Sequence, residues 1–200
     1  MVDMRWSEAI ACKCRMNMTQ RPVIHTLSIS NKGVRLMWAL TWMLLFRPSP
    51  RPAHAWRCLL LRLFGAKLGR RVHPYPSAKI WAPWNLVMGD DACLAESVDC
   101  YCVDRIVIGA RSTISQYSFL CSASHDFRHS GHPLVAAPIV IGSDVWIAAD
   151  VFVAPGVTIA DGVVVTARSS VFDDLPQWTV AGGYPARPIK RREFRNEAGK

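Results

Sequence analysis

Three histidines, His125, His129 and His132, stand close together in the polar segment formed by residues 124–138. A neutral imidazole, which ordinarily titrates near pH 6.5, can remove a proton from a hydroxyl group, so each is a candidate general base. Three histidines could also bind zinc, although here all three lie in one short segment. The default alternative for each is a solvated loop histidine without a role.

Nucleophilic catalysis has less support in the sequence. The chain has no G-x-S-x-G motif, which would place a serine nucleophile on a sharp turn. The seven cysteines form no C-x-x-C pair, and Cys12-x-Cys14 and Cys100-x-Cys102 have poor spacing for metal ligands. We therefore expect no metal requirement, and the cysteine usage fits a reducing cytoplasm.

The element that must position the histidines is a hexapeptide repeat between Pro138 and Pro176. An aliphatic residue returns at every sixth position, at Ile141, Ile147, Val153, Ile159, Val165 and Val171. The residue after it is often Gly or Ala, as a bend requires. Within each hexad the apolar positions lie two apart, as in a strand, so the pattern predicts short strands stacked in a parallel β-helix.

The same phase is present upstream of this repeat. Met88, Leu94 and Cys100 are six apart, and so are Ile108, Ile114 and Leu120. The phase slips by two residues within 101–107, which predicts a bulge or small loop there. From Leu120 to Ile141 a longer polar insertion interrupts the repeat, and loops that leave a regular solenoid tend to carry function.

Several segments resemble one family of proteins. LLFRPSPRPAHAW, YPSAKIWAPWNL, ISQYSFLCSASHD, APIVIGSDVWIAADVFVAPGVTI, ARSSVF and GGYPARPI are similar to left-handed β-helix (hexapeptide-repeat) acyltransferases, most of all the colanic-acid-type O-acetyltransferases of bacterial exopolysaccharide biosynthesis. The resemblance covers roughly residues 35 to 190 and implies a mainly β fold, a left-handed parallel β-helix with an N-terminal helical segment. It also implies direct acetyl transfer from acetyl-CoA to a sugar hydroxyl, by a homotrimer.

The resemblance also assigns roles to residues near the insertion. His125 has the phase of the catalytic histidine in galactoside and maltose acetyltransferases, five positions after Leu120, whereas His129 and His132 are out of phase. Asp126 could orient the imidazole, and a backbone carbonyl could do so equally well. The backbone N–H of Ala149 is expected to meet the developing oxyanion.

Acetyl-CoA is expected to contact small residues, one aromatic side chain and several cations, which are Trp146, Ala148, Ala149, Ala167, Arg168, Arg187 and Lys190. The alternative for Trp146 is a surface aromatic at a subunit contact. The chain has Phe172-Asp173 where relatives often carry Thr-Lys, and Gly183-Tyr184-Pro185-Ala186 where they close with Gly-Asn-Pro-Ala.

Asp99 and Trp84 are the candidates for binding the carbohydrate acceptor. The alternative for Asp99 is an exposed aspartate that caps a turn. Trp84, like Trp81, could instead seal the end of the core. The acceptor sugar itself cannot be predicted from these residues.

Charge is unevenly distributed along the 200 residues. Residues 1–71 contain thirteen Lys or Arg against two acidic residues, and residues 72–200 contain eleven against thirteen. A basic segment favours an anionic partner, and because no nucleic-acid-binding motif is present we expect no nucleic acid and favour an anionic membrane. The basic N-terminal helices have two expected roles, which can both hold. They could cap the open end of the β-helix, or they could lie on the cytoplasmic leaflet of the membrane near lipid-linked sugars, so we expect a cytoplasmic protein that can contact the membrane peripherally.

Helices are expected over residues 34–46 and from Pro52 to Gly65. The first is too short to span a bilayer, which needs about 20 residues. It could imitate a signal peptide with Ala53-His54-Ala55 as the cleavage site, but Arg47 and Arg51 argue against this. We expect a flexible tail at 1–30, a helical cap at 31–68, a β-helix at 69–187 with a loop at 125–138, and a basic tail at 188–200.

Two other functions fit the same fold. A γ-type carbonic anhydrase would need three histidines around zinc on separate coils, whereas His125, His129 and His132 share one insertion. A non-catalytic scaffold or membrane-associated assembly protein would bind no CoA.

Overall fold

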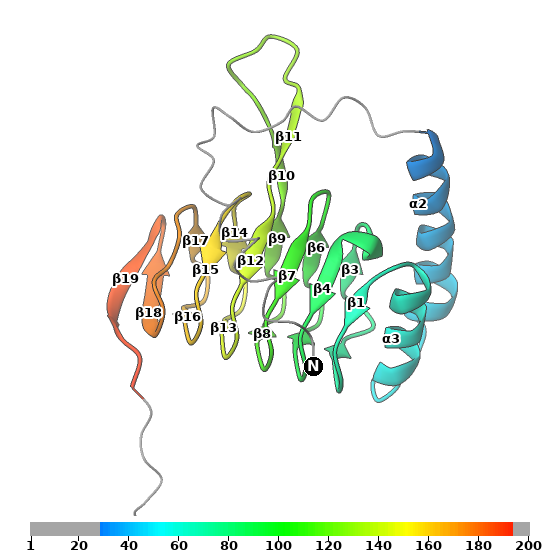
Figure 1. Ribbon diagram of the computed structural model, residues 1–200, viewed down its shortest axis with the longest axis horizontal. Coiled ribbons are helices and arrows are strands. Elements are labelled where there is room, and N and C mark those ends of the chain that lie inside the picture. Colours follow the sequence, from blue (N-terminus) through cyan, green and yellow to red (C-terminus); the bar gives the residue numbers. More distant parts are fainter. Residues whose placement is uncertain (1–28, 194–200) are drawn as a thin grey trace, which may run out of the picture.

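The computed structural model describes residues 29–193 as two helical segments followed by a parallel β-helix (Figure 1). Helix α2 (Ile29–Thr41) continues into a π-helical turn, η2 (Trp42–Phe46), and α3 (His54–Leu63) follows. The expected helix over 34–46 is confirmed. The second helix begins two residues after Pro52 and ends before Gly65, whose φ of 89° is the left-handed conformation typical of a residue just after a helix.

Three parallel sheets form the faces of the β-helix. The first contains β1 (Lys67–Leu68), β4 (Leu86–Met88), β7 (Ile106–Ile108), β12 (Ile139–Ile141) and β15 (Thr158–Ile159). The second contains β2 (His73–Pro74), β5 (Cys93–Leu94), β8 (Thr113–Ile114), β13 (Trp146–Ile147), β16 (Val164–Val165), β18 (Thr179–Gly183) and the antiparallel β19 (Ala186–Arg191). The third contains β3 (Lys79–Ile80), β6 (Asp99–Tyr101), β9 (Phe119–Cys121), β14 (Phe152–Val153) and β17 (Ser170–Val171).

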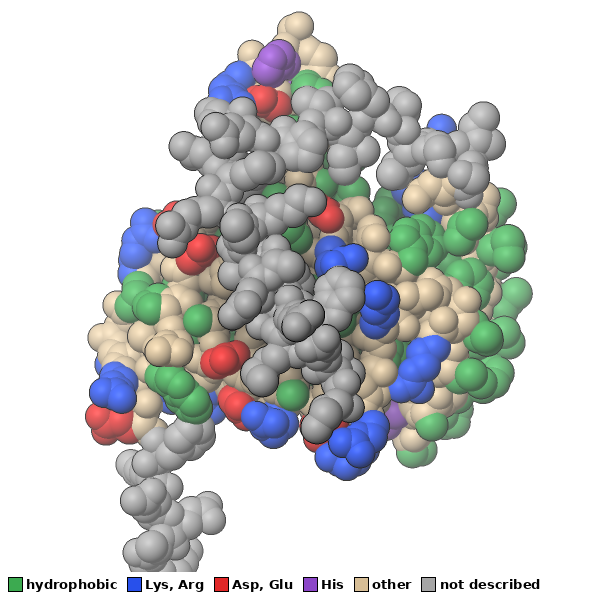
Figure 2. All heavy atoms as spheres, viewed as in Figure 1, with side chains coloured by type: hydrophobic (Ala, Val, Ile, Leu, Met, Phe, Trp, Pro, Cys, Tyr) green, Lys and Arg blue, Asp and Glu red, His purple; other side chains and the backbone are tan. Residues whose placement is uncertain are grey.

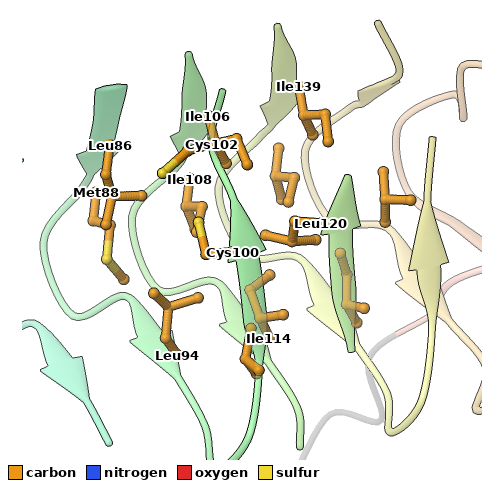
Figure 3. Packing of buried hydrophobic residues seen from close by; sticks show 14 of the residues in the cluster. Leu86, Met88, Leu94, Cys100, Cys102, Ile106, Ile108, Ile114, Leu120 and Ile139 are labelled. Carbon is orange, nitrogen blue, oxygen red and sulfur yellow. The ribbon is translucent and has the colours of Figure 1, made fainter. Parts of the chain in front are cut away.

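The aliphatic residues of the hexads form the core. Each points inward from its strand and stacks on its equivalent in the next coil, so that Ile147 lies between Ile114 and Val165. All six aliphatic residues of the repeat are at most 1% exposed. Figure 3 shows core residues of the preceding coils, among them Leu94, Ile114 and Leu120, pointing into the same interior. The period of six therefore produces one continuous apolar column along the axis.

The small residue after the aliphatic position is explained by close packing of adjacent coils rather than by the expected bend. A Cβ added at Gly142 would lie 2.7 Å from the backbone nitrogen of Asp161 in the next coil. The left-handed conformation instead occurs two residues later, at Asp144, with a φ of 58°. Glycine is required at this corner because the backbones of adjacent coils approach closely.

The predicted irregularity within 101–107 is confirmed at the corner between β6 and β7. The side-chain amide of Asn85 donates to the carbonyls of Cys102 and Val103, at 3.1 and 2.8 Å. The hydroxyl of Ser122 donates to the carbonyl of Tyr101 at 2.8 Å. Side chains from neighbouring coils thus satisfy the backbone of the wider corner.

The helices close the N-terminal end of the β-helix. The indole N–H groups of Trp38 and Trp42 donate to the carbonyls of Ile80 and Ala78, at 2.6 and 2.8 Å. Phe46 and Leu61 are fully buried in the same core cluster. No helix within residues 29–193 has the length and apolarity needed to cross a bilayer.

A buried arginine fixes the proline-rich connector between the helices. The Arg57 guanidinium is fully buried and donates to the carbonyls of Pro74, Pro50 and Arg51, at 2.7, 2.8 and 2.6 Å. It also donates to the hydroxyl of Ser49 at 2.8 Å. These contacts join the connector to β2.

The boundaries of the β-helix lie slightly outside the expected ones. Its first strand begins at residue 67, ahead of the expected starts at residue 69 for the domain and residue 72 for the first coil. Its last strand, β19, continues through residue 191, so residues 188–191 are not part of a tail. The expected tail at 1–30 lies almost entirely outside the described residues.

Candidate active site

The polar insertion is an antiparallel β-hairpin that projects from the body of the β-helix (Figure 1). Its strands are β10 (Ala123–His125) and β11 (Leu134–Ala136). His125 ends β10, and its Nδ1 lies 2.6 Å from the carbonyl oxygen of His132 across the hairpin. Because a carbonyl only accepts, Nδ1 carries the proton in the neutral ring. Nε2 is then unprotonated and can accept a proton.

The Asp126 carboxylate contacts Arg128 and His129 rather than His125. The carboxylate accepts two hydrogen bonds from the Arg128 guanidinium, at 2.8 and 2.7 Å, and lies 3.2 Å from Nδ1 of His129. The bonds from Arg128 hold the pKa of Asp126 well below its usual range. Of the two orienting groups considered from the sequence, the backbone carbonyl is the one in contact with the imidazole.

The three histidines of the hairpin are differently engaged. The side chain of His129 faces Asp126, whereas His132 contributes its backbone carbonyl to His125. No group of three or more potential metal ligands occurs within residues 29–193.

The residues expected to contact CoA gather at one corner of the β-helix. Trp146 in β13 is half exposed, and its indole N–H donates to the Ser115 hydroxyl at 3.0 Å. Ala149 follows at the corner, and its carbonyl accepts a hydrogen bond from the amide of Arg168 in the next coil at 2.9 Å. Ala148 lies at the same corner as Ala149, and Ala167 lies beside Arg168 at the equivalent corner of the next coil.

The amide of Ala149 makes no hydrogen bond to any residue within 29–193. It therefore remains free to donate to a developing oxyanion, the role expected from the sequence.

Arg187 and Lys190 lie on β19, at the edge of the sheet that contains Trp146. The Arg187 guanidinium makes an ion pair with the Asp173 carboxylate at 2.5 Å. Asp173 is part of the Phe172-Asp173 pair that stands where relatives often carry Thr-Lys. This difference gives Arg187 a carboxylate partner that would compete with a CoA phosphate. Lys190 is exposed.

His125 and Ala149 lie at different corners of the same chain. The hairpin leaves between β9 of the third sheet and β12 of the first, whereas Ala149 lies between β13 of the second sheet and β14 of the third. One copy of the chain therefore does not bring the two groups together at one corner.

Asp99 lines a cavity of about 700 Å³ between α2 and the outer face of the third sheet. Burial raises the pKa of the Asp99 carboxyl, and the charge of Lys79 partly opposes this effect. Trp81 lines the cavity, but Trp84 packs partly buried against the core. The structure thus places Asp99 beside Trp81 rather than beside Trp84.

A row of aromatic rings runs along the outer face of the third sheet from this cavity. Neighbouring ring centroids lie 5.0 to 6.2 Å apart in the order Trp81, Tyr101, Phe119, Phe152, Phe172 and Tyr184. This row was not predicted from the sequence. The available signal was that Phe119 and Phe152 each directly precede a core aliphatic residue.

No protein-family model matches the chain. The chain is 51% identical over 159 residues to the putative colanic acid biosynthesis acetyltransferase WcaF of Escherichia coli strain K12, a match covering 80% of this chain and 87% of that protein. The chain belongs to the colanic-acid-type hexapeptide-repeat acetyltransferases. The resemblance inferred from the sequence is therefore confirmed.

Solved structures agree with this membership. A maltose O-acetyltransferase from Clostridium difficile 630 superposes with a TM-score of 0.75 at 26% identity, over 87% of this chain and 94% of that one. A hexapeptide-repeat acetyltransferase from Vibrio cholerae O1 biovar eltor, solved with acetyl-coenzyme A, gives 0.74 at 28% identity, over 86% and 93%. The expected left-handed parallel β-helix is confirmed as the fold class of this acetyltransferase.

Proposed function

We propose that this acetyltransferase transfers the acetyl group of acetyl-CoA directly to a sugar hydroxyl during exopolysaccharide biosynthesis. The observation that carries the proposal is the His125 imidazole, held through Nδ1 by the His132 carbonyl so that Nε2 can accept a proton. The close relative named for colanic acid acetylation supports the substrate class, and the acetyl-CoA complex of a structural neighbour supports the donor.

In the proposed reaction Nε2 of His125 removes the proton from the acceptor hydroxyl as its oxygen attacks the thioester carbonyl. The oxyanion that forms accepts a hydrogen bond from the free amide of Ala149. Collapse of the tetrahedral intermediate expels the CoA thiolate, which takes the proton from the imidazolium. General base catalysis of this kind contributes about 10²- to 10⁴-fold in rate.

Acetyl-CoA would lie along the corner that carries Trp146, Ala148, Ala149 and Ala167. Small side chains there let the pantetheine arm approach the backbone, and Trp146 provides one wall. Lys190 is available for the phosphate groups. Arg168 would exchange Asp150 for a phosphate, and Arg187 would exchange Asp173.

We propose a homotrimer as the active form. Because His125 and Ala149 lie at different corners of one chain, a complete site needs the hairpin of one copy to reach the CoA corner of its neighbour. Light scattering should give three times the chain mass, and a monomer that is fully active would contradict this assembly.

We also propose peripheral contact with an anionic membrane, where lipid-linked sugars are available. The helices expose an apolar surface, visible as the green area over α2 and α3 in Figure 2. It consists of Val34, Leu36, Met37, Leu40, Met43, Leu44, Leu45, Trp56, Leu59 and Leu63. The exposed cations Lys32, Arg47 and Arg62 lie on the same helical segments, a combination typical of interfacial helices.

Sedimentation with anionic liposomes tests this contact. Binding should weaken at 1 M salt, where the Debye length is about 3 Å, and should be lost in Leu44→Glu. Tyr117→Glu is the matched control, because Tyr117 is similarly exposed but lies on the β-helix. Equal sedimentation of the two variants would contradict the membrane contact.

The acetyl transfer itself is tested by release of free CoA from acetyl-CoA in the presence of a purified exopolysaccharide fragment. Mass spectrometry of the fragment should show added acetyl groups. A scaffold protein would neither bind acetyl-CoA nor modify the fragment.

A further inference from the structure

The cavity between α2 and the third sheet has a lining that combines apolar and cationic groups. Leu36, Ala39 and Trp42 contribute apolar surface from the helical side. Three cations and one carboxylate also line it, namely Lys32, Arg35, Lys79 and Asp99. The lining is therefore positive by two charges when Asp99 is ionised. A neutral sugar alone would leave this charge uncompensated.

Arg35 gives the strongest indication of a missing ligand group. Its guanidinium carbon lies 4.4 Å from the centroid of the Trp81 ring, so the cation stacks on the aromatic face. Its Nε is buried and has no hydrogen-bond partner among residues 29–193. A buried charged donor without an acceptor is unfavourable, and an anionic oxygen in the cavity would satisfy it.

The apolar part of the cavity is continuous with the exposed surface of the helix. Leu36 lines the cavity and is also 63% exposed, and Leu40 and Leu44 extend the apolar surface along the same helical segment. A ligand in the cavity can therefore have an anionic part beside Arg35 and an apolar part that follows α2 outward.

We infer that the cavity binds the diphosphate of a lipid-linked sugar, with Lys32, Arg35 and Lys79 binding the phosphate oxygens and Leu36 and Trp42 contacting the first carbons of the lipid. The inference rests on the proposed function, because it specifies how the acceptor is presented. A diphosphate matches the charge of the lining better than a single sugar carboxylate does. A lipid carrier, unlike a soluble nucleotide carrier, also accounts for the apolar wall.

Isothermal titration of the full chain with farnesyl diphosphate, without acetyl-CoA, tests the inference. Arg35→Gln and Lys79→Gln should each weaken binding about 10- to 100-fold, as expected for loss of a charge-assisted hydrogen bond. Arg105→Gln is the matched control, because Arg105 is an exposed arginine of the β-helix that does not line the cavity. It should bind farnesyl diphosphate as the unmodified chain does.

Three further ligands separate the sources of the anionic group. Farnesol, inorganic diphosphate and glucuronate should each bind at least tenfold more weakly than farnesyl diphosphate. Equal binding of inorganic diphosphate would overturn the lipid assignment, and tighter binding of glucuronate would overturn the diphosphate assignment. Equal affinity of the Arg35→Gln and Arg105→Gln variants for farnesyl diphosphate would overturn the site.

The two proposals can fail separately. This inference alone would be overturned if the chain acetylates a soluble fragment while Arg35→Gln and Lys79→Gln bind farnesyl diphosphate as tightly as the unmodified chain does. Binding that depends on these cations in a chain without acetyl transfer would overturn the proposed function and leave the diphosphate site in place.

Discussion

Replacing Arg57 by Met tests how the helical cap is held on the β-helix. The substitution keeps an apolar side chain of similar length and removes the four hydrogen bonds to Pro74, Ser49, Pro50 and Arg51. The buried Pro74 carbonyl loses the shorter of its two side-chain contacts and keeps only Nδ1 of His54, at 3.1 Å, whereas the carbonyls of the exposed connector can bind water instead. We expect the free energy of unfolding to fall by about 3–5 kcal/mol.

For a chain of this size each kcal/mol corresponds to about 2–4 °C in Tm, so the Tm should fall by about 6–20 °C. Thermal unfolding is compared at one fixed chain concentration, because oligomer stability depends on it. Arg62→Met is the control on the same helix, since the Arg62 guanidinium is exposed where it donates to the carbonyls of Leu68 and Gly69. It should cost less than about 1 kcal/mol. Equal Tm losses in the two variants would refute the reasoning.

Three further changes test the site. In steady-state kinetics, Trp146→Ala should raise the KM for acetyl-CoA about tenfold with little change in kcat. An unchanged KM would mean that Trp146 does not contact acetyl-CoA. Asp126→Asn should lower kcat less than threefold because the carboxylate faces Arg128 rather than His125; a hundredfold loss would restore it as the orienting group. Burial raises the pKa of Asp99 in the folded chain above its value in the unfolded chain. The folded chain therefore loses stability as the pH rises from the unfolded-state pKa through the folded-state pKa. Asp99→Asn should therefore gain stability over the unmodified chain between pH 4 and pH 7 in denaturant titrations, and an equal difference at both values would contradict this.

The β-helix could be predicted because its determinants are local and periodic. Each hexad places an aliphatic residue on the interior, as Ile141 and Ile147 do, and every coil repeats the same contact with its neighbours. The position of His125 followed from the same phase. The hairpin that carries it was expected only as a loop, because its antiparallel pairing depends on contacts such as that between Ser124 and Val135, which do not follow the repeat.

Contacts between elements distant in sequence could not be predicted. The cavity forms because Trp38 and Trp42 dock α2 against β3, and no local pattern shows that Arg35 will then lie over Trp81. The partner of Asp126 is, by contrast, local in sequence. This partner, Arg128, is only two residues away and competes successfully for the carboxylate.

The assignment of His125 as the general base is the central claim, and turnover of His125→Ala beside His132→Ala tests it most directly. His125→Ala should lose about 10²- to 10⁴-fold in kcat and retain acetyl-CoA binding. His132→Ala should lose less than tenfold, because the group that holds His125 is the backbone carbonyl, which the substitution keeps. Near-normal turnover of His125→Ala, with loss of turnover in His132→Ala, would contradict the assignment.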